Sequence, residues 1–238
     1  MNVDTDPAGL ASNWAQVCRR VADACVQSGR DPATVDILPV SKTFGPELIR
    51  AAVSLGLTRF GENKVQEIRD KAGPLADCGI DWVVIGHLQT NKAKDVARLA
   101  SEVQSLDRLE LAEALDRRLQ REGRSLDVLI QVKTSADPGK FGLPPADLPG
   151  FLDQLRRFSS LRVRGLMTLA THSDDASQVS GCFRLLRKLR DQSVAQGHQL
   201  PRLSMGMSGD FALAIAEGAT EVRIGTAIFG ARDYADPR

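Results

Sequence analysis

The 238-residue chain has few of the residues on which several common types of site depend. Its four cysteines include no CxxC pair, and its three histidines have no second ligand at useful spacing, so a zinc site is not expected. No apolar run approaches the about 20 residues needed to cross a bilayer. The 31 basic residues are balanced by 30 acidic ones, which argues against general binding to nucleic acid or to anionic membranes.

The first nine residues lack both a basic start and an apolar stretch, so they are not a signal peptide. We expect residues 1–9 to form a flexible tail and residues 10–238 to form a single domain. We also expect a soluble, cytoplasmic protein with reduced cysteines. The basic run at 184–190 has the spacing of the solvated side of an amphipathic helix, so it does not indicate a nucleic-acid site.

Short apolar segments alternate with helical ones along most of the chain. After an amphipathic helix at 10–29, strands are predicted at 36–41, 57–60, 82–86, 103–106, 127–133, 161–167, 202–205 and 221–225, with helices at 46–56, 63–72, 91–100, 108–122, 146–158, 175–197 and 209–217. This order implies right-handed βαβ units and a parallel sheet. Eight units most simply close into a (β/α)8 TIM barrel with an extra N-terminal helix. The alternative, an open doubly wound sheet, lacks its GxGxxG signature after the first strand.

Polar residues follow the predicted strands, although the strands themselves are apolar. In a barrel, reactive groups gather at the carboxyl ends of the strands, so these residues mark a ligand-binding mouth. They are Lys42, Glu62, Asn63, His87, Ser105, Lys133, Thr134, Met167, Thr168, Ser204 and Arg223.

Lys42 ends the first buried strand, where a solvated charge is out of place and a nucleophilic amine facing a cavity is well placed. A lysine that extends from the strand end into water is the structural alternative. Lys133 also ends a strand and is a rival amine, whereas Lys140 lies in a loop and is expected at the surface. A nucleotide-binding P-loop is excluded because the glycines that must precede its lysine are missing.

Two small-residue stretches, 203–210 and 222–226, follow the seventh and eighth strands, where barrels commonly bind phosphate. Ser208 is expected to cap the helix at 209–217, and Gly225 and Thr226 to open a short final helix through Phe229. The alternative is that these residues only cap a helix and make a turn. A phosphate site and an amine together suggest an aldehyde cofactor that carries a phosphate.

Arg223 alternates with apolar neighbours in the last strand, so it is expected to point into the barrel. A buried arginine needs an acceptor, which is either a core carboxylate such as Glu62 or the nitrogen of a pyridine ring. An arginine there would keep that nitrogen unprotonated and make the ring a poor electron sink. Asn63 either caps the helix after the second strand or binds the ring hydroxyl of the cofactor.

Several motifs in combination resemble those of the pyridoxal-phosphate homeostasis family, relatives of the barrel domain of alanine racemase. The similarity spans about 37–234 and rests on VSKT at 40–43, FGEN at 60–63, VQE at 65–67, IGHLQTNK at 85–92, KFGL at 140–143, GLM at 165–167, LSMGMS at 203–208 and VRIGTAIFGAR at 222–232. The resemblance implies a fold type III barrel that binds pyridoxal 5'-phosphate (PLP).

By this resemblance, Lys42 holds PLP as a Schiff base, the phosphate lies at Ser208, Gly225 and Thr226, and Arg223 meets the ring nitrogen. The full cofactor-binding set that we predict is Lys42, Asn63, Met167, Ser204, Met205, Ser208, Arg223, Gly225 and Thr226. The chain departs from the family pattern at Lys133, where asparagine is frequent, and at Ala170-Thr171, where the family often has a proline directly after the segment 165–169.

The resemblance implies a non-catalytic carrier that buffers PLP and hands it to PLP-dependent apo-enzymes. A PLP-dependent amino-acid racemase is the alternative, but racemisation needs two bases, usually a lysine and a tyrosine from a second domain. The chain has one tyrosine, Tyr234, and no length for that domain, whose absence also favours a monomer. A third possibility, a phosphate-metabolite isomerase, would need Glu62 as its base at the mouth.

Overall fold

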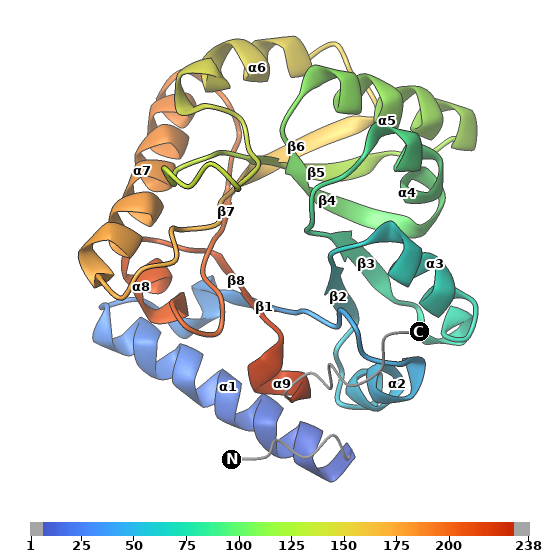
Figure 1. The fold of residues 1–238 in the computed structure, drawn as a ribbon, viewed down its shortest axis with the longest axis vertical. Helices are drawn as coiled ribbons and strands as arrows, with labels where there is room; N and C mark the ends of the chain where they lie inside the picture. The colour runs from blue at the N-terminus through green and yellow to red at the C-terminus, as the bar shows by residue number, and fades with distance from the viewer. Residues whose placement is uncertain (1–6, 231–238) are drawn as a thin grey trace.

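The computed structural model describes residues 7–230, which form a ring of eight strands surrounded by helices (Figure 1). The strands are β1 (Asp36–Pro39), β2 (Arg59–Glu62), β3 (Asp81–Val84), β4 (Ala100–Leu106), β5 (Leu126–Gln131), β6 (Leu161–Met167), β7 (Arg202–Ser204) and β8 (Glu221–Ile224). The helices are α1 (Pro7–Gln27), α2 (Pro46–Ser54), α3 (Val65–Ala72), α4 (Ala93–Leu99), α5 (Leu109–Glu122), α6 (Leu148–Leu155), α7 (Ala176–Ala195), α8 (Phe211–Ala216) and α9 (Thr226–Phe229). Single 3₁₀ turns lie at Pro32–Thr34, Ala76–Cys78, Thr90–Lys92 and Pro145–Asp147.

All strand pairs are parallel, in the order β1-β8-β7-β6-β5-β4-β3-β2. The first and last strands pair directly, with Ile37 opposite Val222. The ring closes where β1 meets β2, through one bridge between Val40 and Gly61. The predicted barrel is therefore confirmed, and the open-sheet alternative is wrong.

The seam between β1 and β2 is tight because Gly61 carries no side chain. A Cβ atom there would lie 3.3 Å from Leu38 and 3.4 Å from both Val40 and Ile85, so any larger residue would push these neighbours apart. On the outer face of the barrel, the Phe60 ring contacts the rings of Trp82 and Phe229, with centroid distances of 6.2 and 6.5 Å. This aromatic layer holds helix α9 against the outer face of β2.

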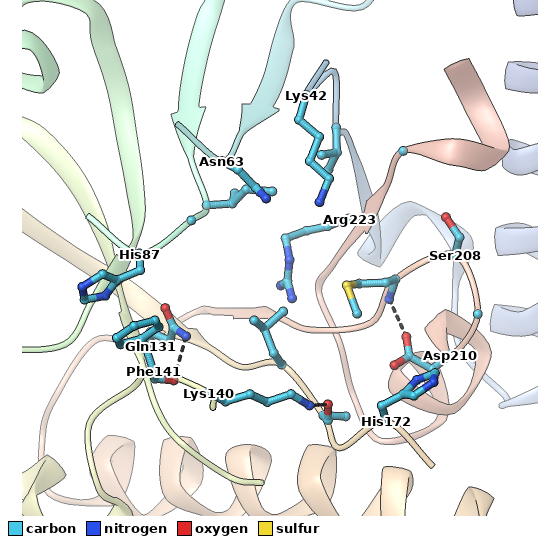
Figure 2. Close-up of a pocket in the computed structure, with 18 of the residues that line it drawn as sticks. Lys42, Asn63, His87, Gln131, Lys140, Phe141, His172, Ser208, Asp210 and Arg223 are labelled. Atoms are coloured by element: carbon cyan, nitrogen blue, oxygen red, sulfur yellow. Dashed lines mark hydrogen bonds between the residues drawn. The ribbon is translucent and has the colours of Figure 1, made fainter. Parts of the chain in front are cut away.

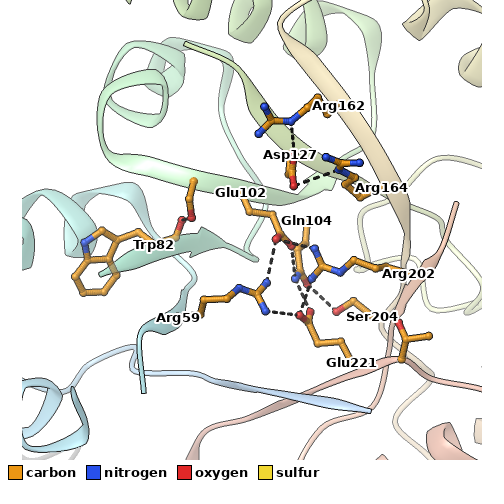
Figure 3. A network of polar contacts seen from close by, with 12 residues as sticks. Arg59, Trp82, Glu102, Gln104, Asp127, Arg162, Arg164, Arg202, Ser204 and Glu221 are labelled. Atoms are coloured by element: carbon orange, nitrogen blue, oxygen red, sulfur yellow. Dashed lines mark hydrogen bonds and ion pairs between the residues drawn. The ribbon is translucent and has the colours of Figure 1, made fainter. Parts of the chain in front are cut away.

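The interior of the barrel at the amino ends of the strands is ionic rather than apolar (Figure 3). Two arginines and two glutamates, Arg59, Glu102, Arg202 and Glu221, form what we call the four-charge ring. Arg59 lies 3.0 Å from Glu102 and 3.1 Å from Glu221. Arg202 lies 2.8 and 2.6 Å from the same two carboxylates. Because the four residues come from β2, β4, β7 and β8, the ring ties distant parts of the sheet together.

Burial alone would raise the pKa of Glu221, but the charges of Arg202 and Arg59 outweigh it and hold the pKa below its ordinary value. Removing one partner of such a buried cluster leaves an uncompensated charge, which typically costs about 3–5 kcal/mol. The four-charge ring therefore makes a large contribution to the folded state at the closed end of the barrel.

The predicted elements are all present, with shifted ends. Helix α1 begins at Pro7, three residues before its predicted start, and residues 1–6 of the predicted tail lie outside the described residues. Strand β2 spans Arg59–Glu62 rather than 57–60. Within residues 7–230, no helix combines the length and the apolar character that crossing a bilayer requires.

Candidate functional site

A cavity of about 650 Å³ opens at the carboxyl ends of the strands (Figure 2). Residues that follow nearly every strand line it. They include Lys42, Asn63, His87, Gln131, Lys140, Phe141, His172, Ser208, Asp210, Arg223, Gly225 and Thr226. The structure thus brings together six of the nine predicted cofactor-binding residues, from positions 42 to 226 of the chain.

Lys42 follows β1 directly after the closing seam, and Figure 2 shows its amine pointing into the cavity towards Arg223. Its neighbour Thr43 has a φ of 73°, and within residues 7–230 no other residue except glycine has a positive φ. A threonine in this region of backbone space is strained and must be held there by its surroundings. The placement of Lys42 therefore depends on contacts made by the residues beside it.

Arg223 is buried in the floor of the cavity, and its inward orientation confirms the prediction from strand alternation. It donates to the Ser204 hydroxyl and to the Thr168 carbonyl, both at 2.8 Å. The predicted core salt bridge with Glu62 is wrong, because Glu62 pairs with Lys71 on the outer side of β2. Burial lowers the pKa of Arg223 to about 10 against the opposing charges of Glu221 and Asp210, so the guanidinium stays protonated at neutral pH.

A buried hydrogen-bond chain connects Arg223 to the four-charge ring. The Ser204 hydroxyl, which accepts from Arg223, donates to the Gln104 side-chain oxygen at 2.7 Å. Gln104 in turn donates to Glu221 at 2.5 Å and to Glu102 at 2.8 Å. The orientation of Arg223 is therefore fixed from below by groups that do not reach the cavity. Figure 3 shows the part of this chain that runs from Ser204 through Gln104 to Glu221.

Ser208, Gly225 and Thr226, the residues of the phosphate prediction, all line the cavity. Helix α9 spans Thr226–Phe229, which confirms the predicted short final helix. Ser208 does not cap a helix, because α8 begins only at Phe211, after Asp210. The carboxylate of Asp210 instead accepts from the Met207 N–H at 2.6 Å and closes the loop that carries Ser208.

This loop also depends on Gly206, whose φ is 94°. A Cβ atom at this position would lie 2.6 Å from the Cβ of Ala214 and 3.0 Å from the Cα of Phe211. Only glycine satisfies both the backbone angle and the space. The small residues of this motif therefore shape the cavity wall.

Three predicted site residues, Met167, Ser204 and Met205, are fully buried and do not line the cavity. Ser204 supports Arg223 from beneath, so its side chain acts on the site through that arginine. Asn63 does line the cavity, and it is not a helix cap, because Lys64 precedes the first residue of α3. A Cβ atom at Gly86 would lie 2.3 Å from the Asn63 carbonyl oxygen, so a glycine is needed for the segment after β3 to pack against the backbone of Asn63.

The cavity is also lined by Gln131, Lys140 and Phe141, which the sequence did not place in the site, together with His87, which it placed at the mouth. The rings of His87 and Phe141 stack with centroids 3.7 Å apart, and Gln131 donates to the Phe141 carbonyl at 2.9 Å. Lys140, expected at the surface, lines the cavity and donates to the carbonyl of Ala170, one of the two residues that depart from the family pattern. Gly139 and Gly142 flank Lys140 and Phe141, and these glycines could have indicated that the loop turns towards the cavity.

The cavity is not lined by four further residues that were predicted at the mouth, which are Ser105, Lys133, Thr134 and Thr168. Lys133, the rival amine, is half-buried but does not line the cavity. Ser105 is fully buried, and its hydroxyl has no hydrogen-bond partner among the described residues. Lys42 is thus the strand-end lysine that reaches the cavity.

The family model for the N-terminal domain of alanine racemase matches residues 7–233. The pyridoxal phosphate homeostasis protein of Pseudomonas aeruginosa is 42% identical over 229 residues, which cover 96% of this chain and 98% of that protein. The chain belongs to the pyridoxal phosphate homeostasis family. A second family member, from Aquifex aeolicus, is 40% identical over 221 residues, which cover 92% of this chain and 97% of that protein.

Solved structures agree with membership of the pyridoxal phosphate homeostasis family. PipY of Synechococcus elongatus, solved with PLP bound, superposes with a TM-score of 0.78 at 37% identity, covering 88% of this chain and 100% of PipY. An alanine racemase of Clostridium difficile has a TM-score of 0.67 at 13% identity, covering 92% of this chain and 57% of the racemase. At that identity the racemase shares the fold alone.

Proposed function

We propose that this chain binds PLP in the mouth cavity, with Lys42 holding it as a Schiff base, and that it buffers and supplies PLP. The observation that carries the proposal is that Lys42, Arg223 and the segment around Thr226 line one cavity in a relative of PipY, which was solved with PLP bound. Bound PLP supplies an aldehyde, which condenses with the Lys42 amine to give an imine and water.

The residues present fit this cofactor. The hydroxyls of Ser208 and Thr226 and the first N–H groups of α9, which have no acceptor within the helix, offer donors to a phosphate. A Cβ atom at Gly225 would lie 3.1 Å from the Val40 carbonyl oxygen, so a glycine at this position lets the two backbone segments lie close together. Asn63, which lies across the cavity from Ser208 (Figure 2), is the proposed partner of the ring hydroxyl.

Arg223 is the proposed partner of the ring nitrogen. Its guanidinium uses two of its five donors on Ser204 and Thr168 and can direct another at a ring nitrogen. A protonated arginine cannot accept from that nitrogen, so the ring stays unprotonated and withdraws electrons poorly. Tyr234, the only candidate for a second racemase base, lies outside the described residues.

Glu62 cannot act as the base that the isomerase alternative requires. Glu62 is fully buried between β2 and α3 and does not line the cavity, so it cannot abstract a proton from a ligand there. We further propose that the chain acts as a cytoplasmic monomer and that PLP-dependent apo-enzymes receive its cofactor, in keeping with the name of its relatives.

The test is borohydride reduction of the protein after incubation with PLP, followed by peptide mapping by mass spectrometry. We expect one pyridoxyl group on Lys42 and none in Lys42→Ala. Lys133→Ala is the matched control, because it removes the rival strand-end lysine, and it should keep the label. Label on another lysine in the unmodified protein would overturn the proposal. A panel of L-amino acids should give no racemisation, and rapid turnover would overturn the carrier function.

A further inference from the structure

The segment that carries Lys42 is held on both sides by a buried cluster outside the barrel wall. On one side, the Ser41 hydroxyl donates to Glu62 at 2.7 Å, and the Ser41 carbonyl accepts from the Lys71 amine at 3.0 Å. On the other side, the strained Thr43 donates its backbone N–H to Glu67 at 2.6 Å. Both residues next to Lys42 are therefore bound to the same group of side chains.

Lys71 joins these contacts into one unit. Its amine lies 2.7 Å from Glu62, 3.2 Å from Glu67 and 3.0 Å from the Ser41 carbonyl. These three acceptors match the three donors of a lysine ammonium group, and the side chain is almost fully buried. Lys71 thus has no donor left for a ligand, and it does not line the cavity. Any effect that it has on the cavity must pass through the segment 41–43.

The barrel itself does little to fix this segment. The ring closes between β1 and β2 through the single Val40–Gly61 bridge, and Ser41 adds one hydrogen bond to the Gly61 carbonyl at 3.1 Å. Strand β1 ends at Pro39, three residues before Lys42. Beyond that point, the cluster supplies contacts that a longer strand ladder would otherwise make.

We propose that Lys71, together with Glu67, is a positioning residue for Lys42 that holds the segment 41–43 so that the Lys42 amine points into the cavity. This inference rests on the proposed Schiff-base function. Burial alone would raise the pKa of Glu67, but the bond from Thr43 and the charge of Lys71 outweigh it and keep Glu67 ionised. An ionised Glu67 is the stronger acceptor for the Thr43 N–H, and this bond helps to hold the positive φ.

The test compares Lys71→Met with the unmodified protein. Methionine keeps the length and apolar volume of the lysine stem but removes all three hydrogen bonds. We expect the apparent affinity for PLP to fall about tenfold, and Schiff-base formation, followed by absorbance, to slow by a similar factor, because a small displacement of a reacting group has large effects. Borohydride should still label Lys42. Lys71→Arg, which keeps the cation and its donors, should restore most of the affinity.

Two further variants keep the test decisive if Lys71→Met folds poorly. Lys71→Met with Glu62→Gln removes the charge of the fully buried carboxylate and leaves only the partly exposed Glu67 without its ion-pair partner, and it should show the same loss of affinity. Arg30→Met is the matched control, because Arg30 also binds two backbone carbonyls, those of Ile215 and Ala219, but does so away from the cavity. It should lower the melting temperature without changing the affinity for PLP, measured well below the transition.

The outcomes separate this inference from the function on which it rests. Suppose that Lys42 is labelled and that PLP affinity and the rate of Schiff-base formation are unchanged both in Lys71→Met and in Lys71→Met with Glu62→Gln. This result would overturn the positioning role and leave the proposed function standing. The positioning role would also be overturned if Arg30→Met weakened PLP binding as much as Lys71→Met does, since general destabilisation would then explain both. Label on a lysine other than Lys42 in the unmodified protein would overturn the function itself.

Discussion

The two ends of the barrel use buried charge in different ways. At the amino ends, two arginines and two glutamates neutralise one another in the four-charge ring (Figure 3). At the carboxyl ends, Arg223 is more deeply buried than either arginine of the ring and lies beside the cavity (Figure 2). Its two acceptors are a hydroxyl and a carbonyl. One end therefore uses ion pairs to join strands, whereas the other keeps a cation facing a cavity. An anionic or electron-rich ligand in the cavity can then interact favourably with the positive charge of Arg223.

The largest expected effect lies at the amino end. Glu221→Ala removes a carboxylate that neutralises both Arg59 and Arg202, so we expect the free energy of unfolding to fall by about 3–5 kcal/mol. Urea unfolding at neutral pH measures this change. A loss of less than about 1 kcal/mol would show that the four-charge ring does not hold the strands together and would remove the contrast between the two ends.

The buried carboxylate of Glu62 gives a pH-dependent effect opposite in sign to that of Glu221 in the four-charge ring, whose pKa is lowered. Burial raises its pKa from 4.5 to about 7, although the charge of Lys71 and hydrogen bonds from Lys71 and Ser41 oppose the shift. Between these pH values the folded state holds a proton that the unfolded state has released. The free energy of unfolding should therefore fall by about 3 kcal/mol as the pH rises from 4.5 to 7.

Glu62→Gln should remove this contribution, and urea unfolding across the pH window measures it. Glu67→Gln is the control with the opposite sign, because the pKa of Glu67 lies below its ordinary value and its stabilisation is lost as the pH falls. Identical pH profiles for Glu62→Gln and the unmodified protein would contradict the prediction.

At the carboxyl end, the main expected change is in affinity. Arg223→Met replaces a buried cation with an apolar chain and leaves the Ser204 hydroxyl and the Thr168 carbonyl without this donor, so we also expect a cost to folding of about 1–3 kcal/mol. Loss of a charge-assisted hydrogen bond to PLP corresponds to about 1.5–3 kcal/mol, or roughly ten- to a hundredfold in affinity. Titration with PLP followed by absorbance measures it. Affinity within twofold of the unmodified protein would place the ring nitrogen elsewhere.

The smallest effect should come from the link between the two ends. Ser204→Ala breaks the chain from Arg223 to Gln104 without touching the cavity wall. We expect PLP affinity to fall about fivefold, equivalent to about 1 kcal/mol, with Lys42 still labelled. An affinity equal to that of the unmodified protein would mean that Arg223 keeps its orientation without support from below.

The sequence predicted the barrel because alternating strands and helices leave few topologies. It also predicted that Lys42, Arg223 and Thr226 share a cavity, since the carboxyl ends of all eight strands lie at one rim. It did not predict the four-charge ring, whose members are up to 162 positions apart. The polar residues at positions 102 and 104, on the same face of an apolar strand, were the signal that was missed.

Other features could not be predicted because competing local contacts decide them. Ser208 looked like a helix cap, but the bond between Asp210 and Met207 delays the start of α8 to Phe211. Lys71 has the sequence context of a solvated lysine in a short helix. Only the fold places it against Glu62 and the Ser41 carbonyl.

The direct pairing of β1 with β8 has a consequence for how the protein is made. Asp36 and Glu221 are partners in the same ladder, so the first strand cannot complete its pairing with β8 until residue 221 has been synthesised. The intervening strands can assemble while translation continues, because each meets its neighbour soon after it emerges. Lys42 and Thr226 flank this junction, so the ability to capture a ligand arises only after β8 has been synthesised and has paired with β1.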